Sequence, residues 1–269
     1  MSPARSMGRV LVVAGSDSGG GAGIEADIKT ISYFGAYAAT AITALTAQNT
    51  TGVQDIQEIP AAFVGQCMRA VLGDIGADCI KTGMLSNSDI INEVAAVIGE
   101  MAAEIPLVID PVMQATEGNE LLGREAAKTL KSTLVPLATL ITPNLPEAEF
   151  LADIAIENPE DMLRAARIIR GLGARAVLVT GGHLPGDEIV DVLVYQDGEQ
   201  RFARSRIQSN NTHGTGCTLA SAIAAQISQG AEMGAAIQKA QDYVRAAIEA
   251  APGFGDGIGP IGHNLLPQK

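Results

Sequence analysis

Short apolar runs that end in turn residues recur along the chain. Four of them are residues 10–14, 107–109, 140–142 and 176–180. Each is rich in Val, Leu, Ile or Ala and is followed by Gly, Asp-Pro or Pro-Asn, a pattern typical of strands buried on both faces. The pattern therefore predicts the parallel strands of a central sheet.

Longer segments between and after these runs carry apolar residues at spacings of three and four, which predicts helices that cover a sheet. They are residues 24–34, 61–72, 88–101, 124–134, 159–172, 217–229 and 233–250. Strands that alternate with helices predict a doubly wound α/β fold. Near the C-terminus, residues 191–195 and 200–202 alternate around Asp197-Gly198, a pair that favours a type I′ hairpin and hence an antiparallel margin. No linker or repeat interrupts the chain, so we expect one domain over residues 1–269.

Composition and charge narrow the functional classes. Hydrophobic residues make up 47% of the 269 residues, which excludes intrinsic disorder, and 18 Lys and Arg against 30 Asp and Glu give a net charge of −12. Nucleic-acid binding requires the opposite charge balance, so no nucleic-acid partner is expected. The 30 glycines and 3% aromatic residues indicate close packing of small and branched side chains.

The cysteines and the N-terminus bear on location. Cys67, Cys79 and Cys217 are odd in number and form no C-x-x-C pair, which argues against disulfides and a structural metal and favours the cytoplasm. The first ten residues lack the features of a signal peptide. The uncharged stretch 30–54 is too polar for a membrane span, so no transmembrane helix is expected.

Two glycine-rich clusters follow predicted strands, where ligands bind in such folds. The first, residues 15–23, has Gly21 where a Walker A loop requires Lys. Residues 21–26 match the dinucleotide pattern G-x-G-x-x-A but lack the acidic residue expected about 20 positions later, so a dehydrogenase stays a weak alternative. A turn needed for packing alone is also open.

The second cluster, residues 211–218, opens a helix rich in small residues. Its amides predict an anion site that could hold a transferring phosphoryl group. Cys217 lies in the first helical turn, where a thiol pKa is lowered, so it is the cysteine placed to accept a proton. A packing role for Cys217 stays open, and Cys67 and Cys79 are expected in the core.

A third constellation follows the strand 140–142. Asn144 and Glu147 lie at the predicted start of a helix near Pro146, and Asp110 ends the neighbouring strand. Amide and carboxylate oxygens there could hold Mg²⁺ beside phosphates. Helix capping is the alternative for each residue in isolation.

Taken together and in this order, these segments resemble the ribokinase-like superfamily, and within it the hydroxymethylpyrimidine/phosphomethylpyrimidine kinases of thiamine biosynthesis. The resemblance spans nearly the whole chain and rests on seven segments in register. They are residues 13–27, Thr43–Thr50, Lys81–Leu85, Asp110–Met113, Thr142–Glu149, Gly181–His183 and Asn211–Thr218. It implies a three-layer α/β/α fold with a mainly parallel central sheet and an antiparallel margin.

The resemblance also implies an activity, namely ATP-dependent phosphorylation of 4-amino-5-hydroxymethyl-2-methylpyrimidine to its monophosphate and then to the diphosphate. By this resemblance Gln48 hydrogen-bonds the pyrimidine, Asp27 and the Gly21 backbone hold its substituents, and Met84 walls the ring. Asn144 and Glu147 would organise Mg²⁺ and phosphates, with Asp110 contributing through water.

For the phosphoryl transfer, the resemblance implies that the amides of Gly214, Thr215, Gly216 and Cys217 bind the moving group. Cys217 would accept the alcohol proton, at a position where other ribokinase relatives have Asp. Thr180, Gly182 and Thr212 would lie near the nucleotide. Many relatives have Lys in place of Thr180, which leaves open the group that neutralises the nucleotide phosphates.

Further expectations concern alternatives and peripheral segments. A pyridoxal or pyridoxine kinase shares the scaffold, and a non-catalytic pyrimidine-binding protein is a third interpretation. The family resemblance implies a homodimer, with the hairpin and residues 31–47 as candidate contacts. Residues 253–260 are expected to form a flexible tail closing near the nucleotide, with His263 solvated and His183 in a turn.

Overall fold

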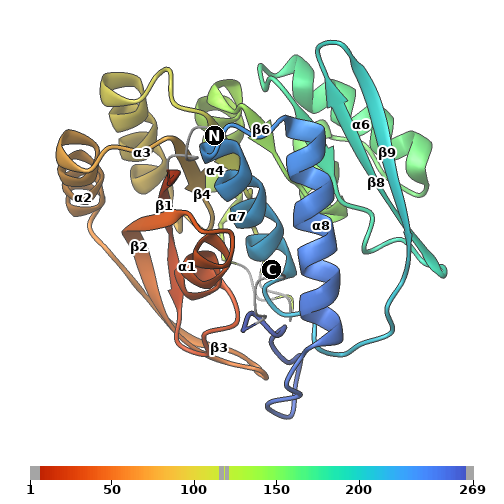
Figure 1. Ribbon diagram of the computed structural model, residues 1–269. Helices are drawn as coiled ribbons and strands as arrows, with labels where there is room; N and C mark the ends of the chain where they lie inside the picture. Colours follow the sequence, from red (N-terminus) through yellow and green to blue (C-terminus); the bar gives the residue numbers. More distant parts are fainter. Residues whose placement is uncertain (1–6, 115–117, 119–120, 265–269) are drawn as a thin grey trace, which may run out of the picture.

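The computed structural model describes residues 7–114, 118 and 121–264. The expectation of no signal peptide concerns the first ten residues. Of these, residues 1–6 lie outside the described range. The described strands form one nine-stranded sheet in the order β3-β2-β1-β4-β5-β6-β7-β8-β9. Helices cover both faces of this sheet, as Figure 1 shows.

The sheet is parallel in the middle and antiparallel at both margins. The strands are β1 (Arg9–Asp17), β2 (Tyr37–Asn49), β3 (Gly52–Glu58), β4 (Cys79–Thr82), β5 (Leu107–Ile109), β6 (Leu140–Ile141), β7 (Val177–Val179), β8 (Glu188–Tyr195) and β9 (Gly198–Ser205). β2, β1, β4, β5, β6 and β7 pair in parallel, whereas β3, β8 and β9 pair antiparallel. The three-layer α/β prediction is confirmed, with a second antiparallel margin at β3 that the sequence did not reveal.

Helices α1 (Gly23–Tyr33), α7 (Thr215–Ser228) and α8 (Met233–Glu249) cover one face. The opposite face carries α2 (Ala61–Asp74), α3 (Ser88–Met101), α4 (Arg124–Thr129), α5 (Leu145–Ala152) and α6 (Pro159–Gly171). Successive side chains of β1 point to opposite faces of the sheet. Leu11 and Val13 pack on the second face, and Val10, Val12 and Ala14 pack on the first. All five side chains are buried, as expected for a central parallel strand.

Two local predictions need correction. The helix expected over 124–134 ends at Thr129 and continues as a π-helical segment, Leu130–Leu134, and a 3-10 turn, Val135–Leu137. Pro136 in that turn has no N–H and cannot continue an α-helical ladder.

The β8–β9 turn is the second correction. It consists of Gln196 and Asp197, because Tyr195 pairs with Gly198. Neither turn residue has a positive φ, so the turn is not type I′. Much of the uncharged stretch 30–54 forms β2, a strand rich in Ala and Thr. Among the described residues, no helix combines the length and apolarity needed to cross a membrane.

Candidate active site

A cavity of about 990 Å³ lies at the carboxyl ends of the parallel strands. The loops after β1, β5, β6 and β7 and the start of α7 contribute to its wall. Most of the residues predicted from the sequence line it together. They are Gln48, Met84, Asp110, Asn144, Glu147, Thr180, Gly182, Thr212, Gly214, Thr215, Gly216 and Cys217. The cavity therefore joins the three predicted constellations in one place.

The N-terminus of α7 opens into this cavity. Gly214 is its N-cap with φ +84°, and a Cβ at this position would lie 1.8 Å from the carbonyl oxygen of Gly21. Glycine is required there because both the backbone angle and the contact exclude a side chain. Among the described residues, no group accepts a hydrogen bond from the backbone amides of Gly216 and Cys217. These amides and the helix dipole make the α7 N-terminus suited to an anion.

Cys217 stands in the first turn of α7, but its thiol does not have the lowered pKa that the sequence predicts. Burial raises the pKa of Cys217 above its usual value, and the neighbouring carboxylate of Asp110 raises it further. The ammonium group of Lys81 opposes both effects. Desolvation outweighs the favourable effect of the helix terminus, so Cys217 is a thiol at neutral pH in the protein alone.

Lys81 and Asp27 form a buried ion pair beside this thiol. Lys81 Nζ lies 3.0 Å from both carboxylate oxygens of Asp27, and neither side chain is exposed. Ser221 donates a further hydrogen bond of 2.6 Å to Asp27. Burial alone would lower the pKa of Lys81, but the charge of Asp27 raises it above its ordinary value, so Lys81 stays charged.

This pair corrects the prediction for Asp27. Its carboxylate is occupied by Lys81 and Ser221 in the core and does not line the cavity. The sequence predicts no role for Lys81 itself, which lies within one of the seven family segments. The sequence signal that could have singled it out is a lone Lys in the apolar strand β4, because buried Lys residues are almost always paired.

Asn144 and Glu147 cap α5. The Asn144 side chain accepts from the Glu147 amide at 3.0 Å, and Glu147 Oε2 accepts from the Asn144 amide at 2.9 Å, which completes a capping box. The capping alternative is thus confirmed for this pair. Burial raises the pKa of Glu147 well above its usual value, and the nearby charge of Asp110 adds to this effect.

The same two carboxyl groups fit a divalent cation. Burial raises the pKa of Asp110 to about 6. Its buried Oδ2 receives no hydrogen bond from the described part of the chain and lies 4.0 Å from Lys81 Nζ. Mg²⁺ in phosphate sites typically uses one or two carboxylates together with phosphate oxygens. Two buried acidic groups, one with an unsatisfied oxygen, match that chemistry.

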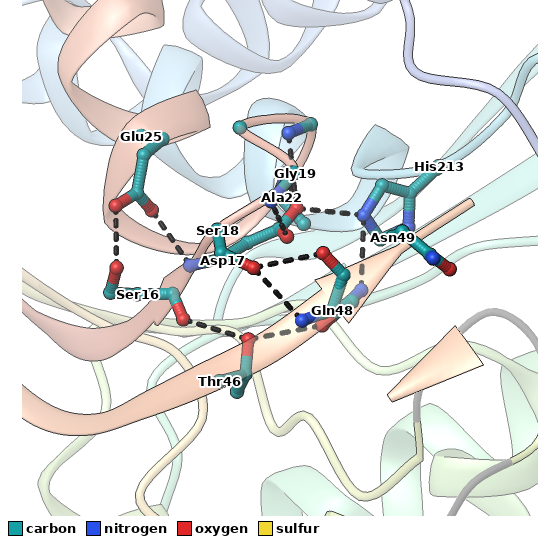
Figure 2. Close-up of polar contacts among 12 residues, drawn as sticks. Ser16, Asp17, Ser18, Gly19, Ala22, Glu25, Thr46, Gln48, Asn49 and His213 are labelled. Carbon is teal, nitrogen blue, oxygen red and sulfur yellow. Dashed lines mark hydrogen bonds and ion pairs between the residues drawn. The ribbon is translucent and has the colours of Figure 1, made fainter. Parts of the chain in front are cut away.

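The glycine loop after β1 is built around Asp17 (Figure 2). Its carboxylate accepts hydrogen bonds from the amides of Gly19, Gly21 and Ala22 at 2.8, 3.0 and 2.8 Å. The Gly21 amide is therefore used within the loop, and Gly21 does not line the cavity. This corrects the expectation that its backbone holds the substituents of the pyrimidine.

His213, for which the sequence predicts no role, completes this cluster. Its Nε2 lies 2.9 Å from Asp17 Oδ2 and 3.2 Å from Gln48 Nε2 (Figure 2). Burial alone would raise the pKa of Asp17, but hydrogen bonds from His213 and the loop amides outweigh it and hold that pKa below its ordinary value. Asp17 is therefore ionised at neutral pH.

Two arginines lie beside the segment that follows Thr180. Arg206 donates to the carbonyl oxygens of Gly186 at 2.7 Å and Gly182 at 2.9 Å, and Arg204 pairs with the buried Asp191. Both arginines line the cavity. Arg206 therefore brings positive charge beside Gly182, whereas the charge of Arg204 is paired with the carboxylate of Asp191.

The C-terminal expectations need correction. Residues 253–260 do not line the cavity but pack on the β2–β3 turn and on the segment before α7, through Ile258 N–H to Thr50 O at 2.9 Å and His213 N–H to Gly259 O at 3.1 Å. His263 is buried, not solvated, with Nε2 2.8 Å from Thr218 Oγ1. His183 lies in a turn as predicted and also lines the cavity.

Of the two cysteines expected in the core, only Cys79 is fully buried. Cys79 is buried in β4, as predicted, whereas Cys67 in α2 is half-buried at the edge of the core. All three cysteines are free.

Comparisons with known proteins agree on one family. The family model described as phosphomethylpyrimidine kinase matches residues 17–262. The thiamine biosynthesis bifunctional protein ThiED of Geobacter sulfurreducens is 50% identical over 97% of this chain, which spans 53% of that longer protein. The hydroxymethylpyrimidine/phosphomethylpyrimidine kinase of Streptomyces coelicolor is 42% identical over 94% of this chain and 93% of its own length.

A solved structure shows the same fold. The ADP complex of Bacillus subtilis pyridoxal kinase has a TM-score of 0.88 and is 37% identical, and the match covers 96% of this chain and 98% of that one. The family match sets aside the nicotinamide-dependent dehydrogenase. The chain belongs to the phosphomethylpyrimidine kinase family, within the ribokinase-like vitamin kinases.

Proposed function

We propose that the protein transfers the γ-phosphoryl group of ATP to 4-amino-5-hydroxymethyl-2-methylpyrimidine and then to the resulting monophosphate, giving the diphosphate used in thiamine diphosphate biosynthesis. The observation that carries this proposal is the shared cavity, in which Gln48 faces the same space as Cys217 and the N-terminus of α7. The names of the relatives support the choice of substrate.

The chain's own groups suit an in-line transfer. The free amides of Gly216 and Cys217 would bind the oxygens of the moving phosphoryl group as its charge builds, and positioning and electrostatics dominate such reactions. The hydroxymethyl oxygen attacks phosphorus, the bond to the β-phosphate oxygen breaks so that ADP leaves, and the alcohol proton passes to the thiolate of Cys217. The second acceptor is an anionic phosphate and requires no strong base.

Because Cys217 is a thiol in the protein alone, it must release its proton to solvent before each transfer to form the thiolate. The ammonium group of Lys81 favours that loss, whereas the carboxylate of Asp110 opposes it. Asp110 and Glu147 would hold Mg²⁺, which supplies charge neutralisation of the phosphates when bound. A cation paired with Asp110 would also offset its effect on the thiol.

Product formation tests the proposal. The purified protein is incubated with Mg-ATP and the pyrimidine, and products are separated by anion-exchange chromatography and identified by mass. We expect the monophosphate first and the diphosphate later, with one ADP for each phosphoryl group. ATP consumption that does not depend on the pyrimidine, with no phosphorylated product, would reject the proposal.

Pyridoxal phosphorylation is the second candidate, favoured by the similarity to Bacillus subtilis pyridoxal kinase. Side-by-side values of kcat/KM for the pyrimidine and for pyridoxal decide between them, and Gln48 and Met84 favour the pyrimidine. A protein that binds pyrimidine and does not turn over ATP would instead be a binding protein.

The proposal includes a cytoplasmic homodimer. ATP is available in the cytoplasm, and Tyr37 and Leu45 on β2 expose 47% and 46% of their surface within the predicted contact region 31–47. Light scattering of the purified protein would show twice the chain mass if this is right and the single-chain mass if it is wrong.

A further inference from the structure

His213 touches two polar side chains with one ring nitrogen. Its Nε2 lies 2.9 Å from Asp17 Oδ2 and 3.2 Å from the terminal amide of Gln48, and all three residues line the cavity. Figure 2 shows the imidazole between the glycine loop on one side and the end of β2 on the other. Gln48 is thus held by a residue that is 165 positions away in the sequence.

The proton on this nitrogen can be assigned from its partners. Asp17 accepts three backbone N–H groups and is ionised, so it can only accept from His213. His213 Nε2 therefore carries a hydrogen and acts as a donor. This single hydrogen points to Asp17, and the nitrogen has no lone pair left to accept from an amide. With Gln48 Nε2 at 3.2 Å, two N–H donors face each other, so the amide oxygen belongs on that side in place of the nitrogen.

The other end of the amide leads to the same orientation. Thr46 Oγ1 lies 3.0 Å from the carbonyl oxygen of Ser16 and 3.3 Å from Gln48 Oε1. The single hydroxyl proton goes to the closer carbonyl, which can only accept, and the hydroxyl oxygen is left as an acceptor. It is then matched by the amide nitrogen of Gln48.

We propose that the Asp17–His213 pair and Thr46 fix the polarity of the Gln48 amide, with its oxygen toward His213 and its nitrogen toward Thr46, so that Gln48 selects a 4-aminopyrimidine edge. One N–H and one oxygen lone pair remain for the cavity in a set order. An amide in this state pairs with a ring nitrogen acceptor next to an exocyclic amino donor, the same match that lets Gln read adenine. This inference rests on the proposed function.

Fixed polarity has a consequence for substrate choice. The 4-oxo analogue presents the reverse order, with N–H on the ring and an acceptor outside it. An amide free to turn over would serve either ring, whereas a fixed amide leaves polar groups unpaired against the analogue, which sites of this kind reject strongly. His213 is a positioning residue in this scheme, because it acts through Gln48.

The test compares kcat/KM for the 4-amino substrate and its 4-oxo analogue. We expect the wild-type protein to prefer the amino substrate by about 100-fold or more. His213→Phe keeps a ring but removes the donor, and it should lower this preference about tenfold, chiefly through a higher kcat/KM for the 4-oxo analogue. Thr46→Val should act in the same direction, and His213→Gln should restore part of the preference because an amide N–H can replace the imidazole N–H.

The control is His263→Phe, which changes the other buried histidine away from the cavity and should leave the preference unchanged. Equal losses on both substrates in His213→Phe, or an unchanged preference in both His213→Phe and Thr46→Val, would overturn the proposal. So would a wild-type protein that uses both rings equally well. If the wild-type protein phosphorylates neither ring, the proposed function fails and this inference falls with it. If His213→Phe does not fold, Thr46→Val and His213→Gln decide the matter alone.

Discussion

His263 ties the stability of the fold to pH. Its imidazole is buried against α7, with Nε2 2.8 Å from Thr218 Oγ1. Burial, helped by the charges of Lys29 and His213, lowers its pKa from 6.5 to about 4. The unfolded chain therefore binds a proton at this imidazole at higher pH than the folded chain does.

The sign and size of the effect follow from linkage. Above about pH 6.5 the imidazole is neutral in both states and the stability contribution is complete. As the pH falls from there to about 4, the unfolded state holds more protons and the free energy of unfolding decreases. The two pKa values give a loss of about 2 kcal/mol between pH 7.5 and pH 5.0, and a limit of about 3 kcal/mol at lower pH.

The assay is urea unfolding followed by circular dichroism at pH 7.5, 6.5, 5.5 and 5.0 for the wild-type protein and His263→Gln. Glutamine can still hydrogen-bond Thr218 but does not titrate, so the variant should lose about 2 kcal/mol less over this range. Carboxylates elsewhere affect both proteins alike and cancel in the comparison. Parallel pH dependences in the two proteins would refute the assignment of a depressed pKa to His263.

Three further substitutions test other parts of the site. Cys217→Ala should slow phosphorylation of the alcohol about 10²–10⁴-fold and slow phosphorylation of the monophosphate by less than about tenfold. Equal losses in the two single-turnover rates would reject Cys217 as the base of the first step. Lys81→Met should lower the free energy of unfolding by about 3–5 kcal/mol because it leaves Asp27 charged in the core. Addition of Asp27→Asn should recover much of this loss in urea titrations, and no recovery would mean that the two charges are not coupled. Gly214→Ala should reduce turnover by about 10²–10³-fold. The control is Gly230→Ala, which has a similar φ of +79° but no atom within 4 Å of the added Cβ and should keep its activity. Similar losses of turnover in both variants would attribute the effect to backbone strain alone.

The residues at strand ends could be predicted from the sequence because their order is a property of the fold. Asp110, Asn144 and Thr180 each follow a buried apolar strand, and the carboxyl ends of parallel strands meet at one edge. Gly214 could be predicted for a similar local reason, since a glycine-rich turn that opens a helix predicts an anion site wherever it occurs.

What the sequence could not reveal depends on contacts between distant segments. Asp27 and Lys81 are 54 positions apart, and their pairing moves Asp27 from the predicted binding site into the core. Cys217 shows the same limit for electrostatics, because a helix terminus predicts a lowered pKa while burial beside Asp110 raises it. His213 and Asp17 meet across 196 positions, and neither had a motif that pointed to the other.

A crystal structure with a non-hydrolysable ATP analogue and the hydroxymethylpyrimidine would test the proposed phosphoryl transfer most directly. We expect the terminal phosphate to lie about 3 Å from the amides of Gly216 and Cys217, with the hydroxymethyl oxygen within hydrogen-bond reach of Cys217 Sγ and the ring edge on Gln48. A terminal phosphate bound more than roughly 15 Å from the start of α7, far beyond hydrogen-bond reach, would contradict the proposed function.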